Sequence, residues 1–555
     1  MKERLAGIER IAGLIFVMLL LLVRTGAGQT AAAAPDFTSS VDEFLNGLVK
    51  QERFSGSILI ARDGRVLMSK GYGMANYEWD VPNTPQTLFR LGSVTKQFTA
   101  VAIMMLQEMG KLNVEDSVCK YVADCPAAWQ PVAIRHLLTH TSGIWNFTNT
   151  PDYRKTMSLP STALETIARF KDKPLEFKPG ERFNYSNSGY VLLGHLIEKL
   201  SGQSYEAFLR EHIFAPLKMT NTGYDNAGAL LKHRASGYTL RTGHLTNAPY
   251  LDMTIPFAAG ALYSTVEDLY LWDQALYTEK LVKQRTLDAI FTPFKDNYGY
   301  GFSIDKRFGL RQISHGGAIN GFTSFISRFP DERATIIVLS NIDSFSTEQI
   351  ASRLARLSLA DKIVVPATVK VDAGVLRSYV GRYQMPPSVA ENFIFDVSLD
   401  GEGLFVKPSG QFGFQIAASS PTAFFDVNQP ETRFTFRRDE KGEVTEMLIE
   451  GLGTEAVRAR RLALPSASLA GNTTFKLGGY KDAKVVALAG TFNNWNQSQT
   501  LCGREGDLWV CRIDLAPGRY TYKFVVDGNW ITDPANPQTE DDGRGNINSV
   551  LVKEK

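Results

Sequence analysis

The sequence predicts an α/β domain followed by two all-β units. Alternating apolar segments near residues 55–71 and 312–339 enclose a long stretch of helical periodicity, which indicates one sheet with a helical insertion. After Pro366 the chain changes to short alternating runs with Gly and Asp at the turns, and these runs indicate β structure alone. The small and polar segment 464–474 has the composition of a linker, so a separate β-rich unit is expected to follow it.

Composition and charge narrow the class of protein. With 44% hydrophobic and 21% charged residues, the chain has the composition of a packed globular protein. Its 555 residues suggest three or four domains, at about 150 residues per domain. Because 60 Lys and Arg face 58 Asp and Glu, the net charge is only +2. Such a balance creates no overall field for a polyanion, so no nucleic-acid partner is predicted.

The N-terminal segment predicts export. Basic residues within residues 1–10 precede the apolar run Ile11–Val23, and small residues follow it. This pattern is typical of a signal peptide, here assigned to residues 1–34 with the cleavage site left open. An uncleaved anchor is the alternative, but the apolar run is shorter than the about 20 residues that span a membrane. We therefore expect a periplasmic or extracellular protein with no stable membrane span after cleavage.

The four cysteines form two local pairs, Cys119 with Cys125 and Cys502 with Cys511. In an exported chain, this pairing predicts two short-loop disulfides. Four reduced thiols are the alternative, because spacing alone does not fix the geometry of a disulfide. The sequence contains no CxxC or HExxH pattern, so neither a metal nor another cofactor is predicted.

The elements of residues 37–362 follow in order. A helix is predicted over Val41–Lys50, and then a hairpin that turns at Asp63–Gly64. Helical periodicity dominates from Ser93 to about Gly202. Three strands and a helix are expected to close the domain: Gln312–Ser314, Phe322–Phe329, Ala334–Leu339 and Glu348–Leu359. Binding sites in such folds usually lie where the sheet and the helices meet.

Ser93 and Lys96 are the first catalytic candidates. They lie at the start of an apolar helix that Gly110 is expected to close, and their spacing places both side chains on one face. The positive end of a helix stabilises an oxyanion, and a nearby cation favours the neutral form of a buried lysine. Ser93 is therefore a candidate nucleophile. The same pattern occurs at Ser117–Lys120, however, and a serine at a helix start is often only a cap.

Two further segments add polar candidates. Tyr185 and Asn187 stand two apart in FNYSNSGY, where a phenol can relay a proton and an amide can hold a substrate. Tyr224–Asn226 has the same spacing, and a buried structural tyrosine is the alternative. His315–Gly317 lies at the end of a predicted strand, and its two glycines would allow close approach of a substrate backbone. A structural histidine is the alternative there, while the absence of G-x-S-x-G disfavours an α/β-hydrolase triad.

Three segments resemble, in their order along the chain, the motifs of the serine β-lactamase and penicillin-binding protein superfamily, in its class C-like branch. They are Ser93-Val94-Thr95-Lys96, Tyr185-Ser186-Asn187 and His315-Gly316-Gly317. Leu137–Ile144 and Pro256–Thr265 also look like signature stretches of that branch. The resemblance covers about residues 40–360. It implies a β-lactamase-like antiparallel sheet with a helical subdomain.

The same resemblance implies roles for individual residues. Ser93 would attack a carbonyl and form an acyl-enzyme that water hydrolyses, while Lys96 and Tyr185 would share the acid–base work. Backbone N–H groups of Ser93 and Ala318 would form the oxyanion hole, which is worth about 3–4 kcal/mol per donor. Substrate binding would fall to Asn187, His315, Gly317 and Ala318.

The chain departs from the family at its third motif, which is often Lys-Thr/Ser-Gly. Here His315 occupies the lysine position, and a mostly neutral imidazole binds a carboxylate less strongly than an ammonium group does. This difference disfavours efficient β-lactam hydrolysis and D-Ala-D-Ala carboxypeptidase action. Relatives with His-Gly-Gly resemble esterases and aminopeptidases that act on D-amino acid amides.

We therefore predict an exported serine hydrolase, an esterase or D-amino acid peptidase, that acts on small acyl or peptide substrates. One alternative is a cell-wall enzyme of the D-Ala-D-Ala or β-lactam type. The other is a catalytically silent penicillin-binding-like receptor.

The two C-terminal units are both expected to be β-rich. Residues 366–463 resemble an extension often found behind such hydrolase domains, and no chemistry is assigned to it. Residues 475–555 predict a β-sandwich and resemble family 48 carbohydrate-binding modules, including the glycogen-binding domain of AMP-activated kinase β subunits. Trp509 is expected in the core of this sandwich.

The sandwich carries the candidate carbohydrate site. Trp495 and Trp530 are expected in exposed polar loops, where an indole can stack on the apolar face of a sugar. The resemblance implies that an α-1,4-glucan is contacted by Trp495, Lys523, Trp530 and Asn548. A sandwich that only packs or binds a partner protein is the alternative.

Overall fold

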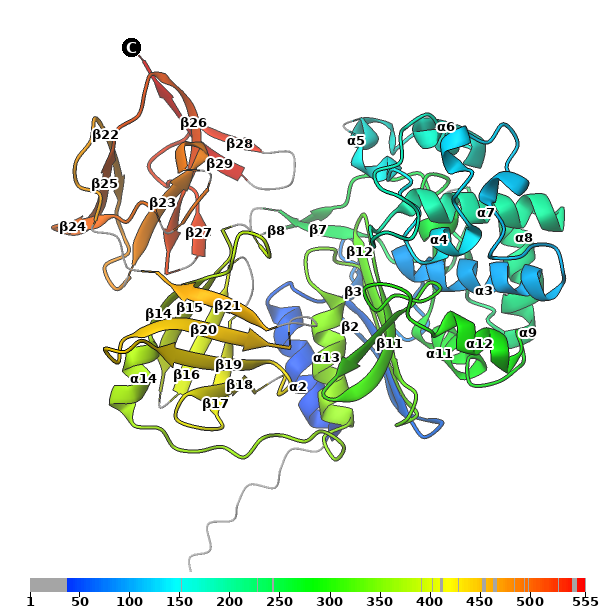
Figure 1. Cartoon of the computed structure of the whole chain (residues 1–555), viewed down its shortest axis with the longest axis horizontal. Coiled ribbons are helices and arrows are strands. Elements are labelled where there is room, and N and C mark those ends of the chain that lie inside the picture. Colours follow the sequence, from blue (N-terminus) through cyan, green and yellow to red (C-terminus); the bar gives the residue numbers. More distant parts are fainter. Residues whose placement is uncertain are drawn as a thin grey trace, which may run out of the picture. The chain divides into compact units, whose positions relative to one another are not determined.

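The structure is a computed structural model, drawn in Figure 1. It describes residues 37–150, 152–226, 228–241, 244–390, 392–401, 403–409, 413–427, 429–451, 456–462, 467–483, 485–493, 495–497, 499–527, 529–541 and 547–554. The predicted signal segment, residues 1–34, lies outside the described residues. Within the described part of the chain, no helix is long and apolar enough to cross a membrane.

A six-stranded antiparallel sheet organises the first domain (Figure 1). In spatial order its strands are β10 (Ser303–Arg307), β11 (Leu310–Ile319), β12 (Phe322–Phe329), β13 (Ala334–Ser340), β1 (Gly56–Arg62) and β2 (Arg65–Tyr72). The hairpin β1–β2 turns at Asp63 and Gly64, both at positive φ, as predicted. Gly56 lies opposite Ser340, so strands from the two ends of the domain pair directly. The predicted sheet with a helical insertion is therefore confirmed.

Helices occupy both sides of this sheet and the insertion between its strands. The long helices are α2 (Phe37–Lys50), α3 (Thr95–Glu108), α6 (Ala163–Lys171), α7 (Asn187–Ser201), α11 (Val266–Ala275) and α13 (Thr347–Ser358). The short helices are α4 (Ile134–Leu138), α5 (Tyr153–Thr156), α8 (Tyr205–Leu209), α9 (Ala215–Leu217), α10 (Phe257–Gly260) and α12 (Gln284–Ile290). In Figure 1, α13 and α11 lie on opposite sides of the sheet, and both contact β1 and β13.

Short turns and strands complete the domain. The single-turn helices are η1 (Gly92–Val94), η2 (Val118–Lys120), η3 (Ala127–Trp129), η4 (Phe147–Asn149) and the π-turn η5 (Arg210–Phe214). The minor strands are β3 (Met74–Asn76), β4 (Val81–Pro82), β5 (Phe89–Arg90), β6 (Gly223–Tyr224), β7 (Tyr238–Arg241), β8 (His244–Asn247) and β9 (Leu262–Ser264).

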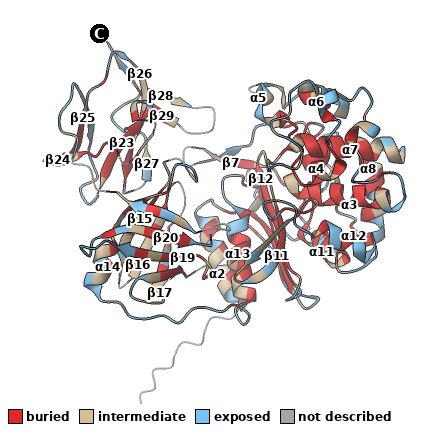
Figure 2. Cartoon of the chain, in the orientation of Figure 1, coloured by how far each residue is buried: buried red, intermediate tan, exposed pale blue. Residues whose placement is uncertain are grey.

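Burial follows the predicted patterns, with one polar exception. β12 and β13 are buried along their whole lengths, and α3 is buried from Thr95 to Leu106, as the red ribbons of Figure 2 show. Among these apolar side chains lies Lys96, which is fully buried. Buried lysines are rare unless they are paired, so this residue is a candidate for a functional site.

The sequence prediction was wrong at two boundaries that matter for the site. Ser93 lies in the turn η1, and α3 begins only at Thr95. β11 runs to Ile319, so His315–Gly317 lie inside the strand and not at its end. The glycines stay in the sheet because β12 supplies partners to this whole segment, with Gly317 opposite Ser324.

The β-rich extension is a closed barrel of eight antiparallel strands, preceded by α14 (Ala373–Tyr379). The strands are β14 (Gly381–Gln384), β15 (Ile394–Asp400), β16 (Gly403–Pro408), β17 (Phe414–Ala418), β18 (Ala423–Asp426), β19 (Arg433–Arg438), β20 (Val444–Glu450) and β21 (Val457–Arg461). Its alternating buried residues, such as Phe434 and Phe436 on β19, form one apolar core. Side chains therefore fill an interior of the size expected for eight strands.

The last unit is built from two antiparallel sheets, as predicted. One contains β22 (Thr473–Leu477), β25 (Leu508–Ile513) and β24 (Gly503–Glu505). The other contains β23 (Val486–Gly490), β26 (Gly518–Val526), β29 (Ile547–Lys553) and β28 (Thr539–Asp541), with β27 (Asn529–Ile531) paired to β26 and η6 (Thr491–Asn493) after β23. Trp509 is buried in its core, as expected.

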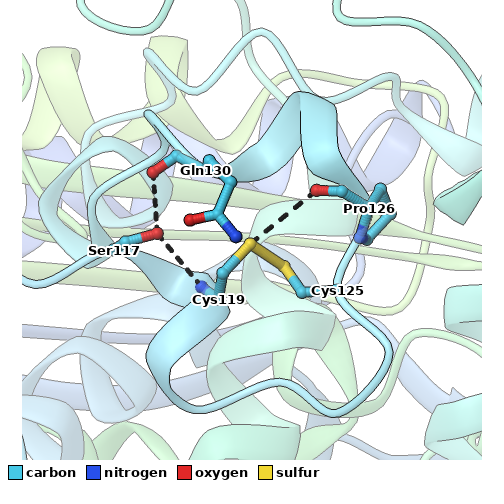
Figure 3. Close-up of a disulfide and its surroundings, with 5 residues drawn as sticks. All are labelled: Ser117, Cys119, Cys125, Pro126 and Gln130. Atoms are coloured by element: carbon cyan, nitrogen blue, oxygen red, sulfur yellow. Dashed lines mark hydrogen bonds between the residues drawn. A yellow bond between two sulfur atoms is a disulfide. The ribbon is translucent and has the colours of Figure 1, made fainter.

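Both predicted cysteine pairs form disulfides, Cys119 with Cys125 and Cys502 with Cys511. Figure 3 shows the first of them beside Ser117. The hydroxyl of Ser117 donates to the carbonyl of Gln130 and accepts from the N–H of Cys119. Ser117, the serine of the second SxxK pattern, therefore caps a turn.

Candidate active site

Two glycines bring Ser93 against strand β11. Gly92 has a φ of +53°, and a Cβ at this position would lie 3.0 Å from the backbone nitrogen of Ala318. A Cβ at Gly317 would lie 2.0 Å from the carbonyl oxygen of Leu91 and 3.0 Å from the nitrogen of Ser93. Only glycine allows this approach of η1 to β11. The backbone nitrogens of Ser93 and Ala318 thus lie on facing segments, which is the arrangement an oxyanion hole requires.

Lys96 makes three polar contacts inside the domain. Its Nζ lies 2.9 Å from Ser93 Oγ, 2.9 Å from Asn187 Oδ1 and 2.8 Å from the carbonyl oxygen of Ala259. Asn187 opens α7 and Ala259 lies in α10, so three separate segments of the chain hold the amine in place.

Burial lowers the pKa of Lys96 well below its usual value. The sequence interpretation attributed such a shift to a neighbouring cation, but the dominant cause here is loss of solvent around the amine. The contacts fit a neutral amine, because two N–H groups can donate to the oxygens of Asn187 and Ala259. The lone pair is then directed at Ser93 Oγ, where it can accept a proton.

Tyr185 is the next candidate, and it directly precedes Ser186, the residue before α7. Its hydroxyl shares a hydrogen bond with Ser93, and the Lys96 Nζ lies 4.9 Å from the centre of its ring. Burial raises the pKa of Tyr185, and the hydrogen bond to Ser93 opposes this rise only in part. The phenol therefore keeps its proton at neutral pH and is a proton donor.

Asn187 connects the lysine to the loop before η4. Its backbone N–H donates to Asn146 Oδ1, and its side-chain nitrogen lies 3.4 Å from Thr148 Oγ1. These two contacts direct the side-chain oxygen of Asn187 toward Lys96. The residue thus holds the lysine as well as bordering the substrate cavity.

His315 lies on β11 and is buried. Its Nδ1 lies 2.6 Å from the carbonyl oxygen of Gly316 and its Nε2 lies 2.8 Å from the hydroxyl of Tyr298. Since a carbonyl only accepts, Nδ1 carries the proton and Nε2 accepts from Tyr298. Burial and the nearby Lys96 lower the pKa of His315 to about 3. At neutral pH the ring therefore supplies no positive charge for a substrate.

A cavity of about 200 Å³ opens beside Ser93. Its apolar lining includes Phe147, Tyr153, Leu251, Pro256 and Ile319, and its polar lining includes Thr148, Asn187 and Asn320. Ala318 also borders the cavity, whereas His315 and Gly317 are not among its lining residues. The structure therefore places Ser93, Asn187 and Ala318 at one cavity.

His140 is a site residue that the sequence reasoning did not nominate. Its ring stacks on Tyr185, lies 5.1 Å from Tyr190 and lies 4.9 Å from Tyr298, all as centroid distances. It was visible only as part of the signature stretch Leu137–Ile144. Burial, with smaller contributions from Lys96 and His315, lowers its pKa well below the usual value.

The alternative motifs do not gather at any cavity bordered by Ser93. Lys120 is largely exposed and pairs with Asp116 at 2.7 Å. The hydroxyl of Tyr224 donates to the carbonyl of Met253. Asp225, its neighbour, is buried between Arg90 and Arg234. These residues have structural partners of their own. Across the described residues, no group of three or more His, Cys, Asp or Glu could hold a metal ion.

The proposed sugar-binding residues share one face of the sandwich. Trp530 is paired with Val525 on β26, and Lys523 lies two residues before Val525 on the same face. Asn548 lies on β29, one residue before Ser549, which pairs with Tyr522 of β26. The ring centroids of Trp495 and Trp530 are 6.2 Å apart.

The burial of these residues corrects part of the sequence prediction. Trp530 lies in β27 and not in a loop, and both tryptophans are partly buried against Ala487, Ala489 and Leu501. Asn548 is buried, and Lys523 is intermediate.

Comparison with known families agrees with this geometry. The Beta-lactamase family model matches residues 40–360, the region that contains Ser93, Lys96, Tyr185 and His315. The chain belongs to the beta-lactamase family. Members of this family are serine hydrolases, and the matched region includes η1 and α3, where Ser93 and Lys96 lie. A second family model, described as the glycogen recognition site of AMP-activated protein kinase, matches residues 473–555.

Relatives of this beta-lactamase family member include penicillin-binding proteins and an amidohydrolase. Penicillin-binding protein 4* of Bacillus subtilis (strain 168) is 30% identical over 456 residues, which cover 74% of this chain and 97% of the relative. The octameric penicillin-binding protein homologue from Pyrococcus abyssi has a TM-score of 0.54 and 29% identity, covering 76% of this chain and 100% of that chain. A D-stereospecific amidohydrolase from Streptomyces sp. has a TM-score of 0.50 and 26% identity. The match covers 57% of this chain and 97% of that chain.

Proposed function

We propose that this beta-lactamase family member is an exported hydrolase that forms an acyl-enzyme at Ser93 and acts as an esterase or a D-amino acid peptidase. The observation that carries the proposal is the fully buried Lys96, whose Nζ lies 2.9 Å from Ser93 Oγ. A buried amine has to be neutral or paired with a charge, and its contacts here are uncharged oxygens. A neutral amine beside a serine is a general base beside its nucleophile.

The acylation step follows from these contacts. The Ser93 hydroxyl gives its proton to Lys96 Nζ, and Oγ forms a bond to the substrate carbonyl carbon. The oxyanion that results faces the backbone N–H groups of Ser93 and Ala318. Tyr185, protonated and hydrogen-bonded to Ser93, gives a proton to the leaving group and regains one from Lys96. Water then hydrolyses the acyl-enzyme by the reverse proton path.

The choice between substrate types rests on His315. A β-lactam or a D-Ala-D-Ala peptide carries a carboxylate, and the neutral His315 offers it no countercharge. We therefore propose substrates without that carboxylate, such as esters and amides. The similarity to a D-stereospecific amidohydrolase at 26% identity supports the amide within this class.

We extend the proposal to the C-terminal sandwich, which we propose binds an α-glucan through Trp495, Trp530, Lys523 and Asn548. The paired indoles and the match to a glycogen recognition model support this assignment. We propose no chemical function for residues 366–463, which contain the barrel. We propose the same division as the sequence suggested, with the hydrolase over residues 37–362 and the sandwich over residues 475–555.

Export is proposed from the N-terminal sequence pattern and from the two disulfides. Short-loop disulfides persist in oxidising compartments and are rare in reducing ones. A periplasmic or extracellular location follows from this reasoning.

The test compares the wild-type chain with Ser93→Ala on aryl esters, D-amino acid amides and a chromogenic β-lactam. Ser117→Ala, in the second SxxK pattern, is the matched control. Loss of turnover of at least about 10³-fold in Ser93→Ala alone supports the proposal, and preference for the β-lactam would point to a cell-wall enzyme. No turnover by the wild-type chain, with retained glycogen binding, would identify a silent receptor.

A further inference from the structure

The cavity beside Ser93 contains no ionisable acid or base in its lining. Among the residues that the structure describes, none of those that border the cavity is Lys, Arg, His, Asp or Glu. Its polar groups are the neutral side chains of Ser93, Thr148, Asn187 and Asn320, together with the phenol of Tyr153. Burial raises the pKa of Tyr153, so this phenol also stays neutral at physiological pH.

Two acidic residues adjoin lining residues in the sequence, and neither borders the cavity. Asp152 precedes Tyr153 and lies 3.2 Å from the Nζ of Lys155. Asp252 follows Leu251, but its Oδ1 accepts hydrogen bonds from the backbone N–H and the hydroxyl of Thr254, at 3.0 and 2.6 Å. Asp252 therefore caps a turn. The amide nitrogen of Asn320 likewise donates to the carbonyl of Pro249 at 2.9 Å, which fixes the orientation of that side chain.

The catalytic groups indicate which part of the substrate, the acyl group or the leaving group, enters this cavity. A general acid has to lie beside the leaving group that it protonates. Tyr185 and Lys96 are not among the lining residues, whereas Ser93 and Ala318 are. A leaving group on the side of Tyr185 leaves the cavity for the acyl group.

The size of the cavity limits the acyl group as well. About 200 Å³ corresponds to roughly seven water molecules at about 30 Å³ each. This volume lies below the range of about 300–1,000 Å³ that is typical of sites for drug-sized ligands. A short acyl chain or a single blocked amino acid is of the right size.

We infer that the acyl pocket of this enzyme selects small, uncharged and largely apolar acyl groups. This inference rests on the proposed function and narrows its substrate class. An ammonium or carboxylate placed in the pocket would lose its hydration and find no countercharge, which is costly. Simple acyl esters and N-acylated amino acid amides are therefore substrates, whereas free D-amino acid amides and dicarboxylic half-esters are poor ones.

The first test measures kcat/KM on two matched substrate pairs with the full chain. One pair is the 4-nitroanilide of N-acetyl-D-phenylalanine and that of D-phenylalanine, at a pH where the free amine is charged. The other pair is the 4-nitrophenyl ester of monomethyl succinate and that of succinate. The neutral member of each pair is expected to react at least about tenfold faster, and equal or inverted rates would overturn the inference.

The second test places a charge in the pocket. Ile319→Asp introduces a carboxylate, and Ile319→Asn has the same size without the charge. The measured quantity is kcat/KM for the free D-phenylalanine anilide divided by kcat/KM for its N-acetylated form. This ratio is expected to be at least about tenfold higher in the Asp variant than in the Asn variant. An unchanged ratio contradicts the inference. If either variant fails to fold, Asn320→Asp is compared with the wild-type Asn in the same way.

These outcomes separate the inference from the proposed function. Turnover that survives Ser93→Ala would refute the acyl-enzyme proposal and the inference with it. Turnover that depends on Ser93 but shows no preference for neutral acyl groups would refute the inference alone.

Discussion

The imidazole ring of His140 stacks on the phenol ring of Tyr185, with 4.1 Å between their centroids and 33° between their planes. The Nδ1 atom of His140 also accepts a hydrogen bond from the backbone N–H of Ser186, at 3.1 Å. His140 therefore fixes both the ring of Tyr185 and the backbone that follows it. It touches no reacting atom and acts as a positioning residue.

His140→Asn tests this role. Asparagine tolerates the φ of +55° at this position and can supply an acceptor for Ser186, but it removes the ring. Because a displacement of about 1 Å at a catalytic group can cost about 10²-fold, we expect kcat to fall about 10- to 100-fold, with KM changed less than about twofold. Steady-state kinetics measure this split. A parallel rise in KM, or a loss of kcat fully explained by unfolding on a thermal melt, would contradict the positioning role.

Lys96→Arg should abolish acylation. Arginine stays protonated in proteins and cannot accept the proton of Ser93, so we expect kcat/KM to fall at least about 10³-fold. In the wild-type enzyme, kcat/KM should rise with pH through the lowered pKa of Lys96, because the neutral amine is the active form. Lys120→Arg, in the exposed second SxxK pattern, is the matched control. Comparable activity of Lys96→Arg and the wild type would exclude Lys96 as the base.

His315 should affect stability in acid more than the pH profile of catalysis. Its folded-state pKa of about 3 lies below the unfolded value of about 6.5, so the unfolded chain binds the proton first as the pH falls. Stability is therefore lost between pH 6.5 and 3, by up to about 1.4 kcal/mol per pH unit. We expect His315→Asn to reduce this slope in urea unfolding series at pH 6, 5 and 4. An identical slope in both proteins would show that His315 is already charged in the folded state.

The sandwich prediction concerns the two half-buried indoles. Trp495→Ala with Trp530→Ala is expected to weaken sedimentation with glycogen at least about tenfold, because each removes an apolar face on which a sugar ring stacks. Trp509→Phe is the control. Its Nε1 donates to the carbonyl of Tyr480 inside the core, so this change should lower the Tm and leave glycogen binding intact. Undiminished sedimentation of the double variant would reject the sugar-stacking site.

Sequence reasoning identified what periodicity and short motifs determine locally. The hairpin at Asp63–Gly64 and the buried strand Phe322–Phe329 follow from residue patterns alone. The pairing of Ser93 with Lys96 also follows from their spacing. These features depend on neighbours in the sequence.

The rest of the fold and of the candidate site depends on contacts between residues that are distant in sequence. The approach of Gly92 to Ala318, the lysine contact with Ala259 and the stacking of His140 on Tyr185 join segments far apart in the chain. No local pattern specifies such contacts. The closure of the barrel is similar, since Tyr383 on β14 pairs with Arg461 on β21 across the whole extension, and short alternating runs do not reveal whether a sheet closes.

The closed barrel has a consequence for how the chain behaves at high concentration. Each of its described strands has a hydrogen-bonded neighbour on both sides, so this part of the chain has no edge strand that could pair with a second molecule. The open sheet of the hydrolase domain does have two edge strands. Lys306 and Arg307 lie on β10, and Arg65 and Lys70 lie on β2, where Val66 and Leu67 are also exposed. Charged side chains at an edge oppose strand addition by another copy. The basic side chains on β10 and β2 thereby disfavour edge-to-edge association of the hydrolase sheet.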